Sequence, residues 1–147
     1  MSKVTRDLHN NIKALRAVAA QTVGTTGTGR TGKVLDRKGY TGVEFIVNYG
    51  TITATNATFT VTIKEGDVTS SLTSVADADL QGTETLAGVG ATATRTSDVS
   101  KNVAKRIGYK GNKRYVQANI KSTITAATPI AIDAILFNPE AAPVSNP

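Results

Sequence analysis

The feature that most constrains the fold is an alternation of side chains in two neighbouring segments, in which every second residue is apolar. In "VEFIVNY", residues 43–49, the apolar face carries Val43, Phe45, Val47 and Tyr49. In "ATFTVTIK", residues 57–64, the apolar face carries Phe59, Val61 and Ile63. A period of two residues is typical of half-buried strands, because successive strand side chains point to opposite faces. The short link between the two segments predicts that they pair as an antiparallel hairpin.

Further segments nearer the C-terminus predict more strands. Residues 105–110 and 113–124 flank Gly111-Asn112, a dipeptide that favours a tight two-residue turn, so we predict a second hairpin. The inner face of its second strand carries Val116, Ala118, Ile120, Ser122 and Ile124. A final strand is expected in "PIAIDAILF", residues 129–137, with the core-facing residues Ile130, Ile132, Ala134 and Leu136.

The composition favours an all-β chain. Threonine accounts for 23 of the 147 residues, and this β-branched side chain suits the half-exposed face of a sheet. We predict an antiparallel β-sandwich, either jelly-roll or immunoglobulin-like, with an N-terminal arm. The expected divisions are a basic arm with a Gly/Thr-rich linker at 1–38, the sandwich at 39–138 and a loose Pro-rich tail at 139–147. Residues 65–100 are expected to form long loops with one or two short strands.

The N-terminal segment allows two conformations. In "DLHNNIKALRAVAA", residues 7–20, helical spacing is shown by Leu8, Ile12, Leu15 and Ala19. A short helix and an extended arm lying on a neighbour both remain open. A Gly- and Thr-rich tether then separates this segment from the sandwich. On this two-part interpretation, a chain without residues 2–30 still folds as a sandwich.

The tether contains "GTGRTGKV", residues 27–34, which matches two phosphate-binding patterns. Gly27, Gly32 and Lys33 have the spacing of a Walker A loop, and Gly27, Gly29 and Gly32 have that of a dinucleotide-binding turn. Both motifs need a strand before the glycines and a helix after them, because the helix points its N–H groups at the phosphates. The flanking segments predict neither element. We therefore interpret the stretch as a linker.

Charge and cysteine content limit the function classes. The net charge of +6 is distributed as +6 over 1–38, −5 over 39–94, +7 over 95–121 and −2 over 122–147. Alternating blocks suit docking between protein surfaces and argue against a uniformly basic nucleic-acid binder, although solvated faces also vary in this way. The chain has no cysteine, no apolar run that could span a membrane and no apolar leader. We therefore expect a soluble protein that is made in the cytoplasm.

The sequence shows no catalytic constellation. His9 is the only histidine, and a surface or interface role is favoured for it. The acidic stretch "VADADLQG" lacks the spacing of a calcium loop, since Glu84 does not fall where the bidentate ligand belongs. Nothing marks a carboxylate pair such as Glu44 with Glu65. We predict a binding or structural protein rather than an enzyme, with no cofactor and no metal.

A basic stretch near the C-terminus has two interpretations. "KNVAKRIGYKGNKRYVQANIK" interleaves Tyr109 and Tyr115 with seven cations. Such a pattern occurs in single-strand nucleic-acid platforms, where bases stack on aromatic rings. We favour a solvated hairpin whose tyrosines close the end of the core. A third interpretation is that this face meets an acidic neighbour.

Four motifs give the chain a resemblance to a known group. "DLHNNI", "GYTGVEFIVNYGTIT", "VADADLQGTET" and "KRIGYKGNKRYVQANI" together resemble small tailed-bacteriophage proteins that are encoded beside the major capsid protein. The resemblance spans about residues 6–137 and implies a virion structural protein. Capsid decoration and cement proteins often place a sandwich over a junction between capsid subunits, with a terminal arm that orders on binding.

We therefore expect a capsid decoration or cement protein, located in the virion, that binds the major capsid protein and forms a dimer or trimer. On the arm, the expected contact residues are Arg6, His9, Asn10, Lys13 and Arg16. On the basic hairpin, they are Arg106, Lys110, Lys113 and Arg114. The alternatives are a head–tail connector or tail component of the virion and, from another class, a single-stranded nucleic-acid binder that uses the basic hairpin.

Overall fold

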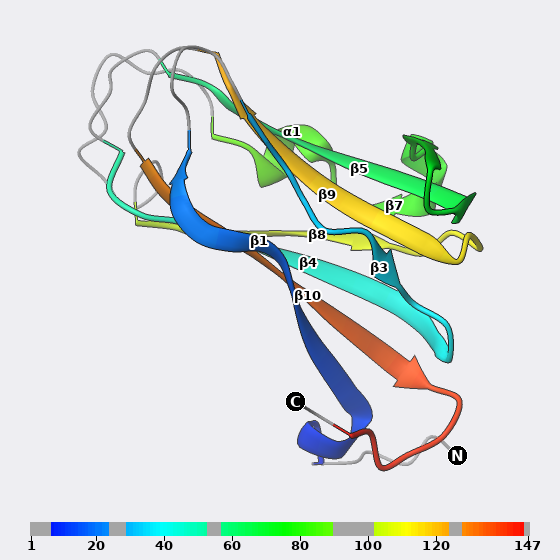
Figure 1. Cartoon of the computed structure of the whole chain (residues 1–147). Helices are drawn as coiled ribbons and strands as arrows, with labels where there is room; N and C mark the ends of the chain where they lie inside the picture. The colour runs from blue at the N-terminus through cyan, green and yellow to red at the C-terminus, as the bar shows by residue number, and fades with distance from the viewer. Residues whose placement is uncertain (1–6, 24–28, 53–56, 90–101, 124–127, 146–147) are drawn as a thin grey trace.

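The computed structural model describes residues 7–23, 29–52, 57–89, 102–123 and 128–145. These residues form two antiparallel sheets that pack face to face (Figure 1), which confirms the predicted all-β sandwich. Sheet A contains, in spatial order, β1 (Ile12–Val23), β10 (Thr128–Pro139), β4 (Tyr40–Tyr49), β8 (Ala104–Tyr109) and β7 (Leu80–Gln81). Sheet B contains β2 (Gly29–Thr31), β9 (Tyr115–Ser122), β5 (Phe59–Val68) and β6 (Ser71–Ser74), and β3 (Leu35–Asp36) also pairs with β9.

Three short helices complete the described part of the chain. They are η1 (His9–Asn11), η2 (Asp77–Asp79) and α1 (Glu84–Ala87). The expectation of loops with short strands at 65–100 agrees with β6 and β7, whereas the continuation of β5 to Val68 and the helix α1 were not predicted. Residues 90–100 lie outside the described residues. No helix in the described ranges is long and apolar enough to span a membrane.

The core lies between the two sheets and is built from the predicted alternating faces. The inward residues of β4 are 3 % exposed or less, and those of β5, β9 and β10 are equally buried. Tyr49 and Phe59 connect the sheets, with ring centroids 5.9 Å apart in an edge-to-face arrangement. The Tyr49 hydroxyl donates to the carbonyl oxygen of Ala87 at 2.8 Å, so this buried polar group is satisfied. Ile124, the last predicted inward residue of β9, lies outside the described residues.

Both predicted hairpins are wrong. β4 pairs with β10 and β8 in sheet A, whereas β5 pairs with β9 and β6 in sheet B. Likewise β8 belongs to sheet A and β9 to sheet B. Each connection therefore crosses from one sheet to the other, because consecutive strands pack their apolar faces against each other instead of sharing hydrogen bonds. Alternation along a strand is the same in both arrangements, so the pattern could not distinguish them.

The predicted N-terminal arm is wrong for residues 12–23. These residues form β1, which pairs with β10 along the edge of sheet A, so they are part of the sandwich and are not helical. A register shift between Arg16 and Val18 accompanies the burial of two consecutive residues, Ala17 and Val18, each 2 % exposed. β2 and β3 continue the chain onto β9 of sheet B. The N-terminal segment thus crosses from one sheet to the other at the edge of the sandwich.

The C-terminal segment also contacts the body. The Glu140 backbone N–H donates to the Gly39 carbonyl oxygen at 2.8 Å, and the Val144 N–H donates to the Asn10 carbonyl oxygen at 2.8 Å. Up to Ser145, the segment expected to be a loose tail therefore runs back along η1. Figure 1 shows this red segment beside the blue N-terminal turn.

Two glycines of the phosphate-loop pattern, Gly29 and Gly32, have a packing role at this edge, and Gly27 lies outside the described residues. A Cβ on Gly29 would overlap the carbonyl oxygen of Ile120, and one on Gly32 would overlap that of Ala118. Gly32 N–H donates to Asn119 Oδ1 at 2.9 Å, and its carbonyl accepts from Gln117 Nε2 at 2.8 Å. These glycines let the chain lie close against β9, which explains their spacing without a phosphate.

The integration of β1 into sheet A gives a direct test. Val18→Asp places an unpaired carboxylate in the core and should lower the unfolding free energy by about 3 kcal/mol or more. Ala19→Asp changes the exposed neighbouring residue by the same charge and should leave the melting temperature almost unchanged. Thermal unfolding followed by circular dichroism measures both. Equal melting temperatures for the two variants would contradict the burial of β1 and would support an N-terminal arm separate from the sandwich.

The close approach at Gly32 gives a second test. Gly32→Ala should cost about 1–3 kcal/mol of stability, because the added methyl group forces β9 and the 32–35 segment apart. Thr31→Ala, at the exposed neighbouring residue, is the matched control. Denaturant unfolding should show a lower midpoint for Gly32→Ala only, and a midpoint unchanged from the wild type would contradict the packing role.

Candidate functional site

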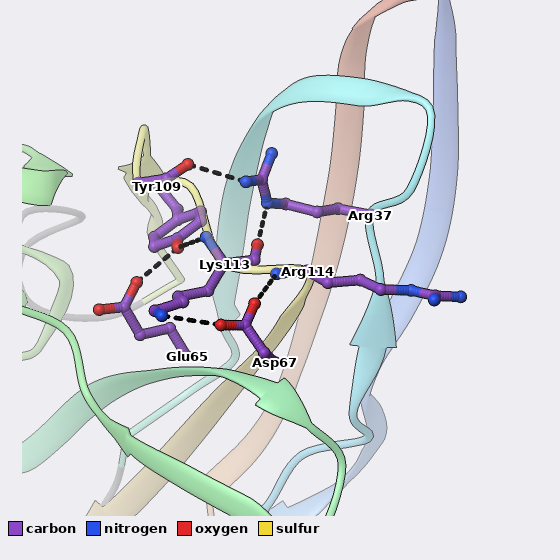
Figure 2. Close-up of polar contacts among 7 residues, drawn as sticks. Arg37, Glu65, Asp67, Tyr109, Lys113 and Arg114 are labelled. Atoms are coloured by element: carbon purple, nitrogen blue, oxygen red, sulfur yellow. Dashed lines mark hydrogen bonds and ion pairs between the residues drawn. The ribbon is translucent and has the colours of Figure 1, made fainter.

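The loop between β8 and β9 is held by Arg37, which follows β3 (Figure 2). Its guanidinium donates to the Gly111 carbonyl oxygen at 2.9 Å and to the Tyr40 carbonyl oxygen at 3.1 Å, and its Nε donates to the Lys113 carbonyl oxygen. Its guanidinium carbon also lies 5.4 Å from the centre of the Tyr109 ring. Arg37 thus donates to three backbone carbonyls and covers an aromatic ring. These contacts indicate that its role is to stabilise the loop.

Tyr109 joins this loop to sheet B. Its hydroxyl donates to Glu65 Oε2 at 2.5 Å and accepts from the Lys113 backbone N–H at 3.0 Å. Burial, with the hydrogen bond to Glu65, raises the pKa of the Tyr109 hydroxyl, so it remains a donor at neutral pH. The tight turn expected at Gly111 does not form: the residues with positive φ in the described ranges are Gly39, Gly82, Asn102 and Asn138.

Two of the predicted contact residues already have partners within the chain. Lys113 Nζ lies 2.7 Å from Asp67 Oδ2, and Arg114 forms two hydrogen bonds with Asp36, at 2.7 and 3.0 Å. The hydrogen bond from Lys113 lowers the pKa of Asp67, and the hydrogen bonds from Arg114 lower that of Asp36. Both pairs are exposed to solvent, so they fix the loop position more than they stabilise the fold.

The aromatic platform of the nucleic-acid alternative is not available on this loop. Tyr109 is 1 % exposed and closes the end of the core, as predicted, whereas Tyr115 is partly exposed and the hairpin expected to carry both rings does not form. The Arg114 guanidinium carbon lies 5.0 Å from the centre of the Tyr115 ring and covers it. The stacking of bases on two neighbouring rings would require both to be open.

The other predicted contact residues are spread over the molecule. Arg6 lies outside the described residues, and His9 and Asn10 form η1, where Asn10 bonds Asp7 at 2.7 Å. Lys13 and Arg16 are on β1, and Lys13 lies beside the C-terminal segment. Arg106 is on β8, and Lys110 follows that strand. The structure therefore does not gather the predicted set into one surface.

Two of the predicted residues share the outer face of sheet A. Strand register places Arg16, Asp133, Ile46 and Arg106 in one row across β1, β10, β4 and β8. Most residues around this row are apolar and at least partly exposed: Ile12, Ala14, Ala104, Ala131, Ile135 and Phe137. The polar neighbours are Glu44 and Asn48 of β4. Phe137 is 36 % exposed, and its ring lies across Gly42. An outer face of an antiparallel sheet normally carries polar residues, so this composition indicates a contact surface.

Glu44 lies on the same face, next to Gly108 of β8. Partial burial raises the pKa of its carboxyl, and the nearby charge of Arg106 offsets only part of that effect. Glu65 is on β5 in sheet B and bonds Tyr109, so the two glutamates do not form a carboxylate pair. Glu84 accepts a hydrogen bond from the Ile63 backbone N–H at 2.7 Å and fixes α1 against β5. In the described ranges, no group of three His, Cys, Asp or Glu side chains is placed to hold a metal ion.

Sequence reasoning missed a basic groove on the outer face of sheet B. The groove has a volume of about 310 Å³ and is lined by Gly29, Arg30, Thr31, Thr60, Thr62, Lys64, Asn119, Ile120 and Lys121. Arg30, Lys64 and Lys121 form no ion pair with the described part of the chain. We call this surface the basic groove. Its cations come from three strands that are distant in the sequence, so no run of basic residues predicted the groove. The alternation along each strand indicated only that Lys64 and Lys121 face outward.

Comparison with known proteins gives weak likenesses. No family model matches the sequence, and no curated protein matches it. Among solved structures, the SPBc2 prophage-derived protein YomS is 11 % identical with a TM-score of 0.47, over 87 % of this chain and 94 % of that chain. A Bacillus endospore appendage protein has 12 % identity and a TM-score of 0.40, over 93 % and 98 %. The tobacco streak virus coat protein has 13 % identity and a TM-score of 0.39, over 97 % and 96 %. These values do not assign a function.

The opposite pKa directions of two carboxyls give a pH test. The pKa of Glu44 is raised, so its ionisation destabilises the fold as pH rises above the ordinary value of 4.5. Glu44→Gln should therefore raise the melting temperature at neutral pH, with a gain that disappears in acid. The pKa of Asp36 is lowered, so its ionised form supports the fold and Asp36→Asn should lower the melting temperature at neutral pH only. Melting curves across pH measure both, and shifts of the same sign would contradict the assignment.

Proposed function

We propose that this chain is a bacteriophage virion structural protein that decorates or cements the head by binding the major capsid protein. The resemblance of four sequence motifs to small proteins encoded beside the major capsid protein supports the virion role. The basic groove is the observation that supports the proposed surface for binding the capsid protein. Its cations are unpaired within the described chain and lie among threonine hydroxyls and the Asn119 amide, so it fits an acidic protein surface.

A weak contact of this kind is sufficient for stable binding when it is repeated many times over a shell. A shell presents many copies of one acidic surface, and each copy of this protein adds its own groove. Weak individual contacts, each sensitive to salt, then give stable coverage of the shell. This groove, and not the 110–114 loop, is the proposed docking surface, because Lys113 and Arg114 are already paired with acids of the same chain.

Co-sedimentation with empty phage heads tests the proposal. The wild-type protein should sediment with heads in many copies at low salt and in fewer copies at moderate salt. Lys64→Glu with Lys121→Glu should reduce the bound copies by at least about tenfold, because two attractions become repulsions. Lys38→Glu with Lys110→Glu changes two exposed cations outside the groove by the same charge and is the matched control.

Other outcomes separate the alternatives. Occupancy of a single vertex by one ring of copies would replace decoration with a head–tail connector. Binding to single-stranded oligonucleotides without binding to heads would replace it with the nucleic-acid function. A loss of head binding caused by Lys110→Glu alone would move the contact to the 110–114 loop.

A further inference from the structure

The outer face of sheet A is built around its middle strand. Sheet A has five strands, and β4 has two on either side. Strand register places Asp133 of β10 on one side of Ile46 and Arg106 of β8 on the other. An acid and a base thus flank an apolar residue at equal spacing, about 4.8 Å per strand.

We propose that this face is the interface of a symmetric homodimer whose two-fold axis runs along β4. Rotation about such an axis places β10 over β8 of the second copy and β4 over its own equivalent. Asp133 then faces Arg106 of the partner subunit, and the same pair forms again on the other side of the axis. Ile46 meets Ile46 of the partner subunit between the two ion pairs. A two-fold interface needs a surface that is complementary to itself, and the three central residues of this row meet that need, while Arg16 on β1 lies over the β7 edge of the second copy.

The shape of the neighbouring row agrees with the same axis. Ile135 of β10 and Gly108 of β8 flank Glu44 in register. On the β8 side there is a hollow of about 280 Å³, lined by Glu44, Gln81, Gly82 and Arg106. The rotation brings Ile135 of one copy over this hollow in the other. A projecting side chain therefore meets a depression twice in the dimer.

The alternative axis in the same plane, across the strands through Ile46, is disfavoured. It would place β10 over β10, and Asp133 would then face Asp133 of the partner subunit. Arg106 would likewise face Arg106 of the partner subunit. Like charges at close range oppose association. The axis along β4 produces one such contact, Glu44 over Glu44 of the partner subunit, whereas the axis across the strands produces at least two, so the charge pattern favours the axis along β4.

The area is sufficient for a specific contact. Five strands about 4.8 Å apart, with lengths from two to twelve residues, make a face of roughly 600 Å². Two such faces bury about 1,200 Å² in total, which is the lower limit of the usual range for specific interfaces. Interfaces at this lower limit are commonly weak, so dimerisation has to be measured at a high protein concentration.

Exchange of the two charges tests the interface. In Asp133→Arg, two arginines face each other at both contacts, and in Arg106→Asp, two aspartates do. Each variant alone should dimerise at least about tenfold more weakly than the wild type. An equimolar mixture of the two should form a heterodimer, because every contact then joins an arginine to an aspartate. Sedimentation equilibrium at about 100 µM, a concentration suited to an interface of this size, measures all three samples.

Controls separate this result from misfolding and from the capsid proposal. Asp133 and Arg106 are both exposed, so each single variant should remain folded. A small loss of melting temperature is expected because Asp133→Arg places a cation opposite Arg16 and Arg106→Asp removes the charge near Glu44. Lys121→Asp, on the opposite face of the sandwich, should dimerise like the wild type while it loses head binding. A monomeric wild type, unchanged dimerisation of the single variants, or a mixture that stays monomeric would each overturn the proposal. The outcome is independent of whether the protein binds heads.

Discussion

The contact between the inner faces of the two sheets is the constraint on which the rest of the structure depends. β4 and β10 supply alternate apolar residues to it from sheet A, and β5 and β9 supply them from sheet B. Because side chains alternate along a strand, burial of one parity fixes which residues lie outside. The row of Asp133, Ile46 and Arg106 is on the outer face because Phe45, Ile107 and Ala134 are inside. A slip of one residue would exchange the two faces.

The cations of this chain act in two ways, and their surroundings decide which. Arg37, Lys113 and Arg114 meet carbonyls, carboxylates and aromatic rings of the same chain, and they hold the loop that closes one end of the core. Lys64 and Lys121 point outward from the middle strands of sheet B, where the neighbouring residues are threonines and an asparagine. The first group is used by the fold. The second group is available to another molecule.

The two outer faces of the sandwich differ in chemistry, which suits two kinds of contact. Sheet A presents apolar residues with balanced charges, a composition that fits a second copy of the chain. Sheet B presents cations among polar groups, a composition that fits an acidic surface. A dimer formed through sheet A would direct its two basic grooves away from each other.

The sequence by itself determined the β class and the inward residues of β4, β5, β9 and β10, because a period of two is a local property of each strand. Only the tertiary structure decided which strands pair. β1 joined the edge of sheet A, and both expected hairpins opened across the core, since every strand offers the same backbone groups to any neighbour. The same holds for the site. The acids that neutralise Lys113 and Arg114 lie 46 and 78 residues away in the sequence, and charges so distant meet only once the chain has folded.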